Sequence, residues 1–137
     1  MSQVQQTVQQ TEPAVVPTLG SGSGTTATTF FGPADRAYTI TAINWIYATK
    51  GGSGATFQLF KDTGTNAPGA GTSILSGGTA VDISSTTAIV ANTTTANAGN
   101  ATAGVLSLAA GDRLSWQLGG TLTALVGVTA TVQLIPA

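Results

Sequence analysis

Apolar and polar residues alternate strictly along two segments near the C-terminal end of the chain. In the first segment, Leu114, Trp116 and Leu118 alternate with polar residues. In the second, residues 126–134, valine, alanine and leucine alternate with glycine, threonine and glutamine. Because successive side chains of a strand point to opposite faces of its sheet, both segments predict β-strands with one buried face. The shared face of the first segment predicts a core position for Trp116.

Two earlier segments, residues 36–47 and 55–61, are rich in the β-branched and aromatic residues that favour strands. In the first of them, Ile43, Trp45 and Tyr47 fall on one face. The opposite face holds Ile40, Ala42, Asn44 and Ile46. Since both faces carry apolar side chains, we expect this strand to lie inside a sandwich or against a neighbouring subunit.

Stretches rich in glycine, threonine and asparagine separate the strand segments, as turns and loops do. Weaker strand patterns occur at residues 72–75, 81–90 and 105–108. No segment shows a sustained helical period with capping residues. The pattern therefore predicts an all-β domain over residues 30–137, an antiparallel sandwich or barrel. Threonine pairs do not recur at a fixed period, which argues against a solenoid.

The first 29 residues form a separate compositional zone. Five of the first ten residues are glutamine, prolines stand at 13 and 17, and residues 20–24 alternate glycine and serine. Proline removes backbone donors and glycine adds chain entropy, so this zone is not expected to fold alone. A floppy tail is one interpretation; we favour an extended arm that docks on a partner or a neighbouring subunit. The apolar residues expected to make that contact are Val4, Val8, Val15, Val16 and Leu19.

The content of charged residues narrows the range of possible partners. Only 7% of the 137 residues are charged, against about 25% in an ordinary soluble domain. A chain with so few charges is expected to have low solubility as a free monomer. The composition therefore indicates that other copies or partners cover much of its surface. Four basic residues are too few to neutralise a phosphate backbone, so we expect no nucleic-acid partner. No apolar stretch is long enough for a membrane helix, and we expect no membrane partner.

The chain also offers little chemistry. It has no histidine and no cysteine, which removes most transition-metal sites, most nucleophile–base pairs and all disulfides. We therefore expect no enzymatic activity, no cofactor and no metal. Most of the charged residues stand in adjacent pairs that we interpret as residues at strand ends, Asp35 with Arg36, Lys61 with Asp62, and Asp112 with Arg113.

Residues 62–66 have the oxygen-rich spacing of a calcium loop, because an aspartate, a glycine and an asparagine alternate with threonines. The segment lacks a second carboxylate, so a turn stabilised by Asp62 and Asn66 is the favoured interpretation. The aromatic residues Trp45 and Tyr47 leave three roles open: the core, a subunit interface, or a platform on which sugars stack.

The C-terminal part resembles the closing strands of the capsid decoration, or cement, proteins of tailed bacteriophages. The resemblance rests on the apolar strand at residues 105–108, the turn at Ala110–Leu114, the hairpin at Gly119–Leu122 and the final valine- and threonine-rich strand. It extends over about residues 36–137, and the arm and the low charge fit it too. It includes no motif from which a site residue can be transferred.

The resemblance implies a jelly-roll-like β-sandwich with an extended N-terminal arm. It implies a structural virion protein on the outer capsid surface, which bridges neighbouring capsomers and stabilises the shell. The implied partners are the major capsid protein and further copies of the chain, as a homodimer or homotrimer. From the residue pattern alone, and not from the resemblance, we add Trp45 and Tyr47 to the apolar residues of the arm as candidate interface residues. The alternative is a fibre, head-fibre or other carbohydrate-binding β-sandwich module, which solvent-exposed Trp45 and Tyr47 would favour.

Overall fold

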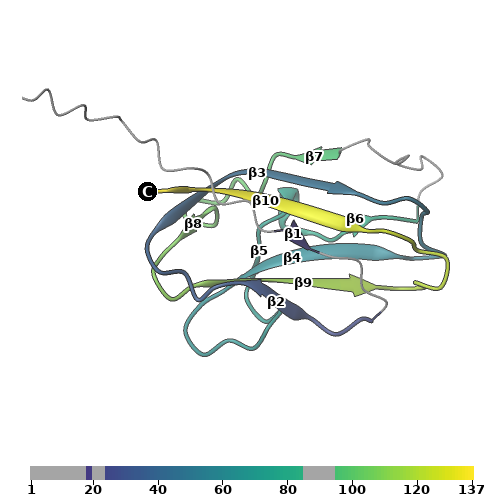
Figure 1. Ribbon diagram of the computed structural model, residues 1–137, viewed down its shortest axis with the longest axis horizontal. Helices are drawn as coiled ribbons and strands as arrows, with labels where there is room; N and C mark the ends of the chain where they lie inside the picture. The colour runs from purple at the N-terminus through teal and green to yellow at the C-terminus, as the bar shows by residue number, and fades with distance from the viewer. Residues whose placement is uncertain (1–17, 20–23, 85–94) are drawn as a thin grey trace, which may run out of the picture.

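Two antiparallel sheets pack face to face as a sandwich in the computed structural model, which describes residues 18–19, 24–84 and 95–137 (Figure 1). In this part of the chain the only helical segment is a short 3-10 turn at Ser76–Gly78. No helix within the described ranges is long and apolar enough to cross a membrane. The all-β class and the sandwich expected from the sequence are confirmed.

Ten strands make up the two sheets. The first sheet has the order β1–β10–β3–β7, and β8 also pairs with β3; the second has the order β2–β9–β4–β5, and β6 also pairs with β4. The strands are β1 (Thr18–Leu19), β2 (Thr28–Phe31), β3 (Tyr38–Ile46), β4 (Thr56–Asp62), β5 (Thr72–Ser73), β6 (Val81–Asp82), β7 (Thr95–Asn97), β8 (Ser107–Leu108), β9 (Arg113–Gly119) and β10 (Thr129–Pro136).

The strand pairings are nested along the chain. β1 pairs with β10, β2 with β9, β3 with β7 and β8, and β4 with β5 and β6. The chain thus forms one long antiparallel hairpin. The hairpin is wound on itself, so that β10 also pairs with β3 and β9 with β4. This winding defines a jelly roll, the arrangement expected from the family resemblance.

The core lies between the inner faces of the two sheets. Phe57 and Leu59 of β4 and Val132 and Leu134 of β10 have no exposed surface, and Ile43 of β3 is 2% exposed. Such side chains contribute about 1.5–3 kcal/mol each when they leave water, so this layer supplies most of the drive to fold. Leu114 and Leu118 are buried as their alternation predicted, and Trp116 packs half-buried against the same core.

A β-bulge in β3 changes the faces that strict alternation predicted. Gln133 pairs with Ala42 but the next residue, Leu134, pairs with Ile40, so β3 has one residue more than β10 at this point. The bulge brings Ile40 to the buried face that also holds Ile43. The prediction that Ile40 and Ile43 lie on opposite faces of the strand is therefore wrong, because strict alternation does not allow for a bulge.

The folded domain also begins earlier than the sequence pattern suggested. β1 and β2 pair with the last two long strands, so the expected boundary at residue 30 falls inside β2. Residues 95–97, expected to be part of a connecting loop, form β7 beside β3. These strands have two to four residues, too few to show a period. Of the strand expected at residues 81–90, Val81–Asp82 forms β6, and residues 85–90 lie outside the described part.

Asp62 ties the loop that follows β4 across the outer face of the second sheet. Its carboxylate is fully buried and accepts hydrogen bonds from the Gly71 amide at 2.9 Å and from the Ser115 hydroxyl at 2.5 Å. The Gly69 amide donates to both the carboxylate and the same hydroxyl oxygen. A Cβ on Gly71 would stand 1.9 Å from the Lys61 carbonyl oxygen, so only glycine permits this approach.

Replacing Asp62 by alanine is expected to lower the free energy of unfolding by about 1–3 kcal/mol, because the Gly71 amide and the Ser115 hydroxyl lose a buried acceptor. Urea unfolding followed by tryptophan fluorescence measures the change. The matched control is Thr65→Ala, an exposed residue of the same loop, expected to change the free energy by less than about 0.5 kcal/mol. Equal stability of the two variants would contradict this role of Asp62.

Candidate functional site

The aromatic residues expected at an interface lie in the core. Trp45 is 6% exposed and Tyr47 is 2% exposed. The Trp45 ring packs against Phe57 of the opposite sheet, with 6.1 Å between ring centroids. The structure therefore places both side chains where neither a partner nor a stacked sugar reaches them. Alternation showed that they share a face but not that this face points inward.

The expected contact residues of the arm lie mostly beyond the described structure. Val4, Val8, Val15 and Val16 fall outside the described residues. Leu19 is the second residue of β1 and pairs with Ala130 of β10. Its backbone thus belongs to the edge of the first sheet, so the chain enters the domain at that edge.

The first sheet is built without charge. None of the five strands that the structure describes in it contains Asp, Glu, Lys or Arg. Its outer face presents threonine, amide and aliphatic side chains from β3 and β10, and Ile135 on it is 41% exposed. The residues of this uncharged face are Thr39, Thr41, Ala42, Asn44, Ile46, Thr129, Thr131, Gln133 and Ile135.

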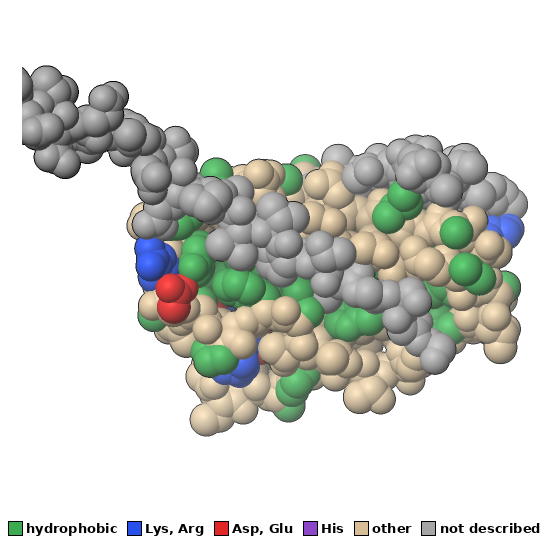
Figure 2. Space-filling model, viewed as in Figure 1, with side chains coloured by type: hydrophobic (Ala, Val, Ile, Leu, Met, Phe, Trp, Pro, Cys, Tyr) green, Lys and Arg blue, Asp and Glu red, His purple; other side chains and the backbone are tan. Residues whose placement is uncertain are grey.

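The charged residues of the described part gather at the two ends of the sandwich instead. At one end Ala34, which precedes the pair Asp35 and Arg36, donates its amide to the Asp112 carbonyl. Lys61 reaches the carbonyls of Gly104 and Ser107 at the same end and so joins the two sheets. At the other end lie Lys50, in the loop after β3, and Asp82. On the face in view, Figure 2 shows blue and red side chains towards the ends and green and tan ones between them.

The outer face of the first sheet carries no charged side chain from its described strands, whereas about 25% of the residues of an ordinary soluble domain are charged. A surface without charge loses little solvation free energy when a partner covers it. The uncharged face of the first sheet is therefore the candidate contact surface of this domain. Composition shows only that the total charge is low; the pairing of β3 with β10 shows that one whole layer contains no charged residue in its described strands.

The segment with calcium-like spacing, residues 62–66, accepts hydrogen bonds from the side chain of Arg113. The Arg113 guanidinium donates to the carbonyl of Asn66 at 2.8 Å and to that of Gly64 at 3.1 Å. The Asp62 carboxylate faces the amides of its own loop, as described above. The carbonyls of Gly64 and Asn66 are thus engaged by Arg113. Asp62 stabilises the loop, but through Gly69 and Gly71 rather than through the expected turn with Asn66. No group of three acidic side chains forms within the described ranges.

A groove of about 500 Å³ lies on the outer face of the second sheet. Its floor is formed by β4 and β9, where Gln58 and Gln117 stand directly opposite each other. Thr25 and Ala80 lie at its sides, and Phe60 contributes an aromatic ring. This groove cannot be predicted from the sequence pattern, because Gln58 and Gln117 are far apart in the chain and only the strand register makes them neighbours.

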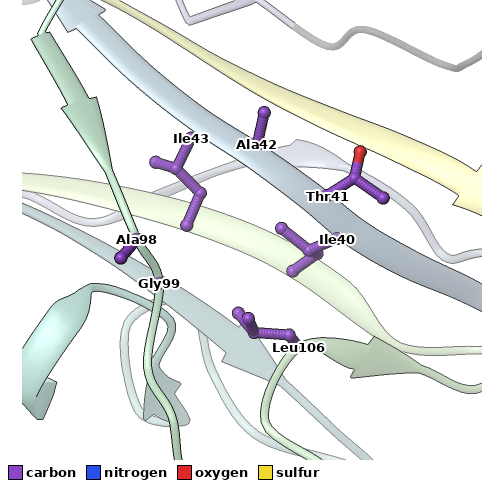
Figure 3. A pocket seen from close by; sticks show the side chains of 7 residues that line it. All are labelled: Ile40, Thr41, Ala42, Ile43, Ala98, Gly99 and Leu106. Carbon is purple, nitrogen blue, oxygen red and sulfur yellow. The ribbon is translucent and has the colours of Figure 1, made fainter.

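A smaller cavity of about 50 Å³ lies beside β3, between the places where β7 and β8 pair with it. Figure 3 shows Ile40, Ile43 and Leu106 pointing to one side of β3, and Thr41 and Ala42 pointing to the other, as the bulge requires. A cavity this small holds at most about one or two water molecules. It is therefore a packing defect beside the bulge.

Comparisons of the chain with models of protein families, with curated proteins and with solved structures find no match. Any function must therefore be argued from the geometry of the domain itself.

Two exposed carboxylates are held by local hydrogen bonds that favour their charged forms. The Tyr38 hydroxyl donates to Asp35 at 2.6 Å, and this bond, followed by the nearby Arg36, lowers the pKa of Asp35 below its ordinary 3.8. The hydroxyl and the amide of Ser84 lower the pKa of Asp82 in the same way. Both groups therefore contribute stability above their ordinary pKa, and that contribution disappears as the pH falls through the lowered values.

Replacing Tyr38 by phenylalanine is expected to raise the pKa of Asp35 towards 3.8, because the carboxylate loses its strongest donor. The pKa of Asp82 should stay the same and serves as the internal control. Carboxyl carbon shifts followed by NMR between pH 7 and pH 2 measure both titrations. An unchanged Asp35 titration in the variant would refute the contribution of the Tyr38 hydroxyl.

Proposed function

We propose that this chain is a structural virion protein that binds the outside of an icosahedral phage capsid and bridges neighbouring capsomers. The observation that carries the proposal is the first sheet, whose described strands contain no charged residue while the charges stand at the ends of the sandwich. The jelly roll is compatible with it, since this architecture recurs in viral capsid domains and also in lectins.

The physical chemistry of the uncharged face suits attachment to a protein shell. A threonine- and amide-rich surface buries hydrogen-bonding groups that a partner's backbone and side chains can satisfy, without the cost of desolvating a charge. Exposed Ile135 and half-buried Ile46 add apolar area to the same face. A protein that touches several capsomers needs only a modest contact at each one, because the contacts act together as avidity.

The carbohydrate-binding alternative loses its original support, because Trp45 and Tyr47 are buried. A stacking platform needs an exposed ring, and the described structure offers neither of these two. The proposal therefore keeps the shell-binding role as the primary function and assigns the contact to the uncharged face and to the arm that precedes β1.

Ile135→Lys is expected to weaken shell binding at least ten-fold, because it places a charge at an exposed apolar position of the proposed contact face. The matched control is Val126→Lys, the same kind of change at a residue that is 55% exposed outside the uncharged face, beside Thr49 and near Lys50. Binding is measured by co-sedimentation of the purified chain with undecorated capsids of the encoding phage. Failure of the wild-type chain to sediment with these shells would overturn the proposal, and equal binding by both variants would remove the uncharged face from it.

The second expectation concerns self-association. Light scattering of the purified chain should give the mass of a dimer or trimer. A monomer at all concentrations would contradict the oligomer.

Deletion of residues 1–17 should abolish shell binding while the far-ultraviolet spectrum of the sandwich persists. Undiminished binding by the truncated chain would contradict the role of the arm.

A further inference from the structure

We propose that the groove on the outer face of the second sheet binds a neutral oligosaccharide. This function is separate from shell binding, because the groove lies on the opposite layer from the uncharged face. A chain attached through the first sheet would turn the groove towards the surroundings.

The amides of Gln58 and Gln117 are fixed in orientation. The Gln58 Oε1 atom accepts the Leu59 amide at 3.1 Å and the Ser73 hydroxyl at 2.7 Å. The Gln117 Nε2 atom donates to the Thr25 carbonyl at 3.0 Å. Since a backbone amide only donates and a carbonyl only accepts, these bonds settle which end of each side-chain amide is oxygen and which is nitrogen.

This arrangement leaves one donor group and one acceptor on residues that line the groove. Within the described residues the Gln58 Nε2 and the Gln117 Oε1 have no hydrogen-bonding partner. They come from residues that are direct cross-strand neighbours. A sugar ring carries adjacent hydroxyls that both donate and accept, so a held amide donor beside a held amide acceptor matches its chemistry.

The remaining lining supports a saccharide over other ligands. Phe60 gives an aromatic surface for the C–H groups of a sugar ring, and Thr56 adds a hydroxyl. The lining includes no charged residue, so an anionic ligand would find no counter-charge. A second hollow of about 360 Å³ shares Thr25 and Gly120 with the groove and is lined further by Leu122, Thr123 and Leu125. The pair of hollows offers room for more than one sugar unit.

A peptide strand fits this groove poorly. Strand addition needs an open sheet edge, and the floor strands β4 and β9 pair with neighbours on both sides. Their backbone groups are already used in the sheet, so recognition must come from side chains. That requirement favours a ligand that presents hydroxyls rather than a backbone.

The test combines a glycan array with NMR on the full-length chain. The array presents neutral and acidic oligosaccharides, and each neutral hit is titrated into ¹⁵N-labelled protein. The expected result is a saturating shift of the side-chain NH₂ signals of Gln58 and Gln117. The absence of any neutral hit, or hits confined to acidic glycans, would overturn the proposal.

Three variants locate the binding. Ala80→Trp fills the groove from an exposed position without removing a hydrogen bond and should weaken binding at least ten-fold. Gln117→Leu should do the same because it removes the acceptor. The matched control is Gln133→Ala, a glutamine on the uncharged face of the first sheet, which should bind like the wild type. Glycan binding that survives Ala80→Trp would refute the site, whereas capsid co-sedimentation of that variant reports separately on the proposed shell contact.

Discussion

The contact between the inner faces of the two sheets is the interaction on which the rest of this structure depends. Neither sheet is stable alone, because each has an apolar face that only the other covers. Phe57 and Leu59 on one side belong to the same buried core as the β3 and β10 side chains on the other, so a polar group placed there would lose its contact with water. Since this layer stabilises the domain, the outer faces are free to carry residues chosen for binding.

The distribution of charge follows from the same division. Charged groups stand where strands end and loops begin, and there they secure the connections: Lys61 joins the two sheets, Asp62 fastens the loop after β4, and Arg113 holds the carbonyls of that loop. With the charges placed at the ends, the two outer faces differ from each other in shape rather than in sign. One is an uncharged sheet surface, and the other is a groove with an amide pair on its floor.

The sequence pattern predicts the sandwich because residues 114–118 and 126–134 alternate, and because residues 36–47 and 55–61 are rich in β-branched and aromatic side chains. It does not predict β1, β2 or β7, which are too short to show a period, nor the bulge that brings Ile40 to the core face. The pattern also does not predict that Trp45 points inward or that Gln58 pairs with Gln117. Both features depend on which strand lies opposite, and alternation within a single segment contains no information about its partner.

The nested pairing delays folding during synthesis on the ribosome. β10 lies between β1 and β3, and β9 lies between β2 and β4, so one central strand of each sheet comes last in the chain. A ribosome that has released residues 18–112 has produced strands whose main partners do not yet exist. Contacts of such long sequence separation form slowly, since the loop-closure entropy comes before the gain from pairing. Folding of this domain therefore waits for residues 113–137, and until then the strands already made expose apolar surface and unpaired edges, which favour aggregation.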